Sequence, residues 1–152
     1  MNPESQEYRT ARALYVDTRI DDLLAFCREQ ELAGRSELAE FWRGLCWMHM
    51  DVKEKAISSF CNCIEINPKN DKAWSNLGVI YDDREEMEKT HEFTKRAFDL
   101  NPGSSINLLN WANFLGRRRE RHFDAEVLFR QGLRNWPNDQ SMLEGLIVSL
   151  GC

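Results

Sequence analysis

Two kinds of segment are missing from this sequence: a long apolar run and an apolar leader. No run approaches the roughly 18 consecutive apolar residues of a membrane-spanning helix. The first seven residues are polar and acidic, so they do not form a secretory signal. We therefore expect a soluble, cytoplasmic protein with no membrane among its partners.

Positive charge is also in short supply. Twenty Lys and Arg stand against 25 Asp and Glu, which gives a net charge of −5 over 152 residues. General binders of nucleic acids need a basic face, so this acidity argues against nucleic acid as a partner. Hydrophobic residues make up 42% of the chain, too much for a disordered one. The length suits one domain or one short repeat array.

Motifs for catalysis and metal binding are absent as well. The chain has no Gly-x-Ser-x-Gly, no phosphate-binding glycine loop and no His-Glu-x-x-His. Five cysteines, an odd number at irregular spacing, do not form a disulfide framework and fit reduced, packed thiols better. Cys61 and Cys63 would point to different sides of a helix, which makes them a poor metal pair. We predict no catalytic residue, no metal and no cofactor.

Three of the four prolines recur at a fixed distance. Pro68, Pro102 and Pro137 are separated by 34 and 35 residues, and each closes a helical pattern. The short polar links that follow them supply caps for the next helices. No stretch alternates as a strand does, so we predict an all-α protein. Between the links the apolar residues have helical spacing in three successive sets: Trp74, Leu77, Gly78 and Tyr81; Leu108, Trp111, Ala112 and Leu115; Leu143, Leu146, Ile147 and Leu150.

The segment Trp74-x2-Leu77-Gly78-x2-Tyr81, followed by Ala97 and Pro102, resembles the tetratricopeptide repeat (TPR), a helix–turn–helix unit of 34 residues. The resemblance implies an α-solenoid, a right-handed superhelical array of TPR-like repeats, because a single unit cannot bury its apolar face alone. It divides the chain into an N-terminal helical pair that is a degenerate repeat or cap, three repeats and a C-terminal stacking helix. Their boundaries are 1–36, 37–70, 71–104, 105–139 and 140–152.

The first of the three repeats is clear only in its second half. In its first helix the large residues of the family fall on Glu40 and Arg43, which do not fit, whereas Trp42 lies beside them. The register of that helix is therefore open. In the N-terminal pair, Thr18-x2-Asp21 has the pattern of a capping box that starts a helix.

In this family the first helix of each repeat lines a concave groove, which usually holds a peptide or helix of a partner. The resemblance therefore implies a non-enzymatic adaptor or scaffold that binds a protein segment. One subclass grips a C-terminal carboxylate with cations, but Ile106 and Asn110 stand where that clamp needs them, so an amphipathic segment fits better. The groove residues carried over from the clear matches are Lys72, Ser75, Asn76, Val79, Asp82, Asp83, Ile106, Leu109, Asn110, Asn113 and Arg117, to which the last helix would add Glu144 and Val148.

The last helix has apolar residues outside the stripe that begins at Leu143. Met142 and Val148 lie off this stripe, whereas a terminal cap should have a polar outer side. We predict a secondary apolar contact at Met142 and Val148, covered by a partner, by a missing continuation of the array, or by a second copy in a homo-oligomer.

Two other functions stay open. A small cytosolic chaperone that shields an apolar client would suit the length and acidity. An RNA-associated helical repeat would use the basic run at residues 117–121. We interpret that run first as a solvated turn, paired with the acidic run at residues 82–88 of the preceding repeat.

Overall fold

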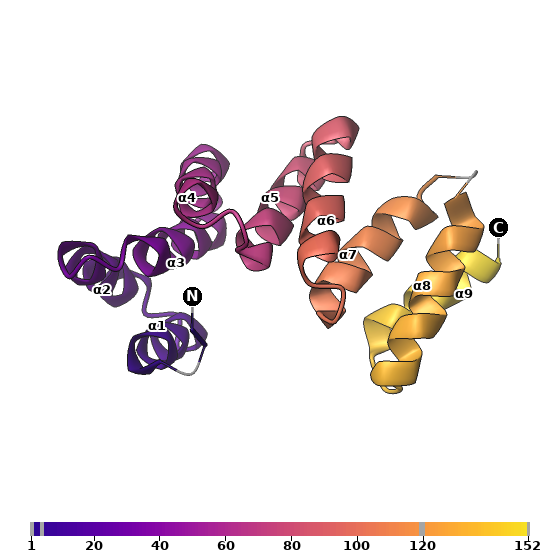
Figure 1. Ribbon diagram of the computed structural model, residues 1–152, viewed down its shortest axis with the longest axis horizontal. Coiled ribbons are helices and arrows are strands. Elements are labelled where there is room, and N and C mark those ends of the chain that lie inside the picture. Colours follow the sequence, from indigo (N-terminus) through magenta and orange to yellow (C-terminus); the bar gives the residue numbers. More distant parts are fainter. Residues whose placement is uncertain (1, 4, 119–120, 152) are drawn as a thin grey trace. The chain divides into compact units, whose positions relative to one another are not determined.

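Helices make up all the regular secondary structure of the residues that the structure describes. The computed structural model describes residues 2, 3, 5–118 and 121–151. The chain folds as two compact units, residues 1–73 and 74–152, and the boundary falls in the first turn of α5. The prediction of an all-α protein is confirmed. In chain order the helices are α1 (Gln6–Val16), α2 (Ile20–Leu32), α3 (Ser36–His49), α4 (Lys53–Ile66), α5 (Asp71–Asp83), α6 (Met87–Leu100), α7 (Ser105–Gly116), α8 (His122–Asn135) and α9 (Gln140–Leu150) (Figure 1).

The polar links after the prolines cap the helices that follow them, as predicted. The side-chain oxygens of Asn70, Ser104 and Asp139 each accept a hydrogen bond from the backbone amide three residues later, at 3.0, 3.3 and 3.0 Å. These bonds satisfy amides that have no partner within the helix. The links therefore start α5, α7 and α9.

The turn inside each of the first three helix pairs contains one left-handed residue. Thr18, Asp51 and Glu85 have φ angles of 59°, 55° and 59°. The amide that follows each of them bonds back to the preceding helix, as when Arg19 donates to Leu14 at 2.9 Å, which is the Schellman arrangement. The predicted capping box at Thr18 is therefore wrong, because Thr18 ends α1 and the cap of α2 makes no side-chain hydrogen bond.

The first unit depends on the close approach of α3 and α4. A Cβ atom on Gly44 would lie 2.6 Å from the ring of Phe60, which is fully buried. Gly78, 34 residues later, approaches Thr94 of α6 in the same way, at 2.7 Å. The register of α3 is therefore the one that preserves the repeat spacing.

Glu40 and Arg43 form a charged cluster where the family has large residues. Nη1 of Arg43 lies 2.6 Å from Oε1 of Glu40, and Nη2 lies 2.6 Å from Oε2 of Glu31 on α2. Burial would lower the pKa of Arg43, but the hydrogen bond to Glu31 and the charges of both carboxylates raise it. The contact between α2 and α3 is thus partly ionic.

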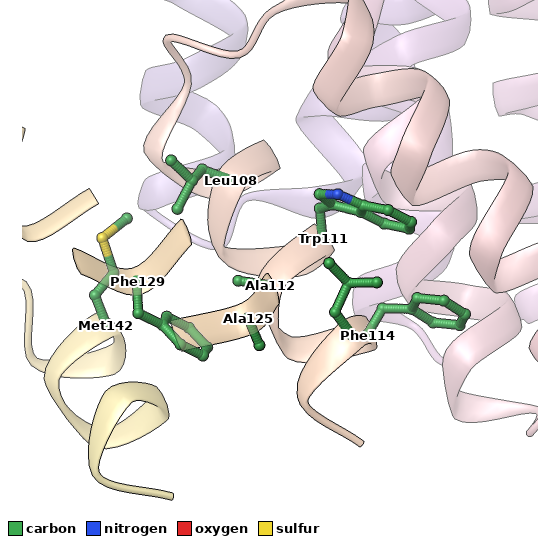
Figure 2. Close-up of a cluster of buried hydrophobic side chains, with 8 residues drawn as sticks. Leu108, Trp111, Ala112, Phe114, Ala125, Phe129 and Met142 are labelled. Atoms are coloured by element: carbon green, nitrogen blue, oxygen red, sulfur yellow. The ribbon is translucent and has the colours of Figure 1, made fainter. Parts of the chain in front are cut away.

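The second unit has one continuous core built from α7, α8 and α9 (Figure 2). A Cβ atom on Gly132 would lie 2.4 Å from the sulfur of Met142, and one on Gly145 would lie 2.4 Å from the ring of Phe129. Each of α8 and α9 therefore provides a glycine where the other provides a large side chain. The core comprises Leu108, Trp111, Ala112, Phe114, Leu115, Ala125, Phe129 and Met142.

The predicted rotation of α9 is wrong. Met142 is fully buried against α8, so it forms no outer contact, whereas Val148 is 64% exposed. Because Leu143 lies 35 residues after Leu108, the expected stripe corresponds to the face of α7 that packs on α8. On α9 this stripe is largely exposed, by 42% at Leu143, 68% at Ile147 and 55% at Leu150.

We expect Gly145→Val to lower the free energy of unfolding by about 1–3 kcal/mol, because the ring of Phe129 would have to move out of a packed core. Urea unfolding followed by circular dichroism measures this change. Gly116→Ala is the matched control, since its Cβ would lie at an ordinary 3.6 Å from Ala125. A Gly145→Val protein as stable as the wild type would contradict the close packing of α8 on α9.

Arg43→Leu would restore an apolar residue at a position where the family has one. We nevertheless expect it to destabilise the protein by about 1–3 kcal/mol, because Glu40 would remain buried without its cation. The control is Arg19→Leu, which removes an ion pair to Asp22 whose side chains are both more than half exposed. Equal losses of unfolding free energy in the two variants would show that the Glu40 cluster is no stronger than an exposed pair.

Candidate functional site

The second unit contains a hollow of about 530 Å³ beside α7 and α9. Leu109 and Asn113 of α7 lie 35 residues before Glu144 and Val148 of α9, so the two helices contribute equivalent faces. The lining mixes apolar, charged and uncharged polar groups. It consists of Asp82, Leu109, Asn113, Gly116, Arg117, Phe129, Ser141, Glu144, Gly145, Val148 and Ser149.

A smaller hollow of about 70 Å³ adjoins the first and shares Asp82, Asn113 and Arg117 with it. Val79 of α5 and Asn110 of α7 line this smaller space. We call the two hollows together the candidate groove. It brings together eight of the sequence-predicted residues: Val79, Asp82, Leu109, Asn110, Asn113, Arg117, Glu144 and Val148.

An ion pair lies where the two hollows meet. Nη2 of Arg117 is 2.6 Å from Oδ1 of Asp82, and the two side chains are 49% and 27% exposed. The guanidinium N–H does not meet the geometry of a hydrogen bond to this oxygen, so Oδ1 of Asp82 has no hydrogen-bond donor among the described residues. A partly exposed pair of this kind contributes about 0–1 kcal/mol, so an incoming polar group can replace either half of it.

Several predicted groove residues have other surroundings. Ser75 is buried and accepts a hydrogen bond from Nδ2 of Asn110 at 2.9 Å, which ties α7 to α5. Lys72 belongs to the first unit, where its Nζ donates to the hydroxyl of Tyr8 at 2.7 Å. Three further predicted residues lie outside the lining of both hollows: Asn76, Asp83 and Ile106.

Eight lining residues were not predicted: Gly116, Phe129, Ser141, Gly145 and Ser149 in the larger hollow, and Gly78, Thr90 and Thr94 in the smaller one. Ser141 and Gly145 lie 35 residues after Ile106 and Asn110, so the repeat spacing would have found them. Phe129 belongs to α8, the second helix of its pair. It could not be predicted from the family expectation that the first helix of each repeat lines the groove.

The described arginines of the basic run contact other residues of the same chain. Arg117 pairs with Asp82, as we interpreted, and the guanidinium of Arg118 lies 4.7 Å from the centroid of the Phe114 ring. Arg121 pairs with Asp124. Arg119 and Glu120 lie outside the described residues.

The buried cysteines are poor nucleophiles. Burial raises the pKa of Cys27 to about 12, that of Cys46 to about 11 and that of Cys63 to about 12. The thiolate is the form that attacks electrophiles and binds metals, and it is scarce at neutral pH in all three.

Within the described residues, no cluster of three His, Cys, Asp or Glu side chains could hold a metal ion. The described helices also include none that is long and apolar enough to cross a membrane.

The fold is that of tetratricopeptide-repeat proteins. The TPR domain of Arabidopsis OM64 superposes with a TM-score of 0.68 at 13% identity, over 76% of this chain and 95% of that one. MamA from Desulfovibrio magneticus gives 0.67 at 19% identity, over 91% and 78%. YrrB, a TPR protein described as having an unusual peptide-binding site, gives 0.65 at 16%, over 95% and 84%. No family model and no curated protein sequence matches. At these identities the likeness establishes the fold, and it confirms the resemblance seen in the sequence.

We expect Cys27, Cys46 and Cys63 to react with a thiol reagent at pH 8 at least about tenfold more slowly in the native protein than in urea, because unfolding exposes them and returns their pKa to the ordinary range. Mass spectrometry of labelled peptides measures each site, and the half-buried Cys61 is the internal control. The sign of the pKa shift also predicts that the stability from these neutral thiols is complete below pH 9 and declines above it. Native-state labelling of all four sites at one rate would contradict this assignment.

Proposed function

We propose that the chain is a non-enzymatic protein-interaction module, an adaptor or scaffold, that binds a peptide or amphipathic helical segment of a partner in the candidate groove. The observation that carries this proposal is the mixed lining of one hollow on α7 and α9, with Leu109 and Val148 beside Asp82 and Arg117. The similar fold of YrrB, a TPR protein described as having an unusual peptide-binding site, supports it.

The lining suggests what such a segment would carry. An apolar side chain would cover Leu109 and Val148, and burial of apolar area contributes about 25 cal/mol per Å². A carboxylate of the segment would compete with Asp82 for Arg117, which is held at the groove by a weak ion pair. Apolar and charged groups on adjoining faces are typical of an amphipathic helix.

A chaperone that shields an apolar client is the second candidate. The specific observation in its favour is the exposed stripe of α9, which an apolar client or a second copy of the chain would cover. A client that stays soluble only with the protein, and loses this protection on Ile147→Asp, would favour the chaperone over the adaptor. A second copy would instead raise the molecular mass measured by sedimentation.

The RNA-binding function has the least support, because Arg117, Arg118 and Arg121 contact groups of their own chain.

The test starts from 16-residue peptides selected on the purified full chain from a random displayed library. We expect Val148→Asp to weaken the selected peptides by about tenfold or more in fluorescence anisotropy, because it places a charge against their apolar side chains. Val127→Asp is the matched control, since Val127 is an exposed valine of α8 outside the groove lining.

Peptides that bind the two variants equally would place the site outside the candidate groove. Peptides that resist Val148→Asp but are lost on Ile147→Asp would favour the stripe of α9 and the chaperone. Circular dichroism confirms that each variant is folded.

A further inference from the structure

Trp42 occupies a groove position of its own helix but is covered. It lies 34 residues before Asn76 and 68 before Asn110, two positions that the family resemblance assigns to the groove lining. Its side chain is nevertheless only 3% exposed. The cover comes from α1, because the ring centroids of Tyr8 and Tyr15 lie 5.3 and 5.9 Å from that of Trp42. Helix α1 therefore lies where a bound segment would lie on α3.

The cover provided by α1 is chemically incomplete. The indole Nε1 of Trp42 is buried and has no hydrogen-bond acceptor among the described residues. A buried donor without a partner costs about 1–3 kcal/mol. Helix α1 thus excludes water from the indole without supplying the oxygen that its N–H needs. A segment that brought such an oxygen would make a contact that α1 does not make.

Helix α1 is attached mainly through its two tyrosines, since Tyr15 also contacts the ring of His49 and Lys72 lies over the ring of Tyr8. Ala11 is its one fully buried residue. Its polar links to the rest of the first unit include the exposed hydrogen bond from Lys72 to Tyr8 and an ion pair of 3.1 Å between Arg35 and Glu7, whose side chains are 46% and 32% exposed. Links of this kind contribute about 0–1 kcal/mol each.

The connection between α1 and α2 is strained in addition. Thr18 has a φ of 59°, a region that a β-branched residue adopts rarely and at a cost of about 1–3 kcal/mol. Movement of α1 would release this strain. The helix is thus held mainly by its two tyrosines and by exposed polar links, and it has a strained turn at its base.

We propose that the face of α3 around Trp42 is a second protein-binding site, which α1 covers in this structure. Its ligand is an amphipathic helical segment of a partner, with aromatic side chains at the spacing of Tyr8 and Tyr15, a backbone or side-chain oxygen for Nε1 of Trp42, and a carboxylate. The carboxylate would face Lys72 and Arg35, the two cations that now hold α1. This site lies in the first unit and is separate from the candidate groove.

Hydrogen exchange of the wild-type full chain gives the first test. If α1 opens locally, its amides exchange at least about 100-fold faster than those in the middle of α3, where opening requires global unfolding. Amides of α1 that are as protected as those of α3 would overturn the proposal. This measurement needs no variant.

A labelled peptide with the sequence of residues 3–18 gives the second test. In fluorescence anisotropy, the double variant Tyr8→Ala/Tyr15→Ala of the full chain should bind it at least about tenfold more tightly than the wild type, because the covering helix of the chain itself is weakened. Adding Lys72→Glu to the double variant should reverse the gain. Lys95→Glu is the control, since Lys95 belongs to the second unit. A peptide in which both tyrosines are alanine should not bind.

A double variant that is folded by circular dichroism and binds the peptide no better than the wild type would overturn the proposal. Binding that survives Lys72→Glu unchanged would also do so, because the proposed site includes that cation. A failure here leaves the candidate groove untouched, since the Val148→Asp experiment reads a surface in the other unit.

Discussion

The structure depends on how closely the two helices of a pair approach each other. In two of the pairs a glycine allows this close approach: Gly44 of α3 lies against Phe60 of α4, and Gly78 of α5 lies against Thr94 of α6. Wherever the glycine sits, the first helix can have only one rotation against the second. That rotation fixes which of its faces enters the core and which remains for binding. The positions of Trp42 on α3 and of Val79 on α5 both follow from this constraint.

Much of the fold was predictable because it is local. Apolar spacing, capping residues and prolines act within a few positions, so the helices and their links could be read directly. The rotation of α9 could not, because Met142 and Leu143 begin two adjoining apolar stripes. The sequence does not say which of them packs on α7 and α8. The turn at Thr18 was missed because threonine is a common cap and an uncommon left-handed residue.

The lining residues of the candidate groove could be predicted where the repeat spacing is regular. They could not be predicted where a side chain forms a contact with another helix. Leu109, Asn113 and Val148 follow from the groove positions that the family resemblance implies, carried along the regular repeat spacing. The bond between Ser75 and Asn110 joins two helices whose relative height a sequence does not give. Lys72 was placed on the correct helix, but its side chain donates a hydrogen bond to Tyr8 of α1, 64 residues away. A contact between residues so far apart cannot be predicted from a single sequence.

The left-handed turn residues have a consequence for how this surface can evolve. Thr18, Asp51 and Glu85 each occupy a conformation that glycine adopts at no steric cost. A change to glycine at Asp51 or Glu85 would relieve strain of about 1 kcal/mol or more per site without touching either proposed binding surface. Stability gained in this way offsets the loss that most substitutions in a binding surface cause. These turns would therefore allow the proposed binding surfaces to accept new side chains while the repeat framework stays folded.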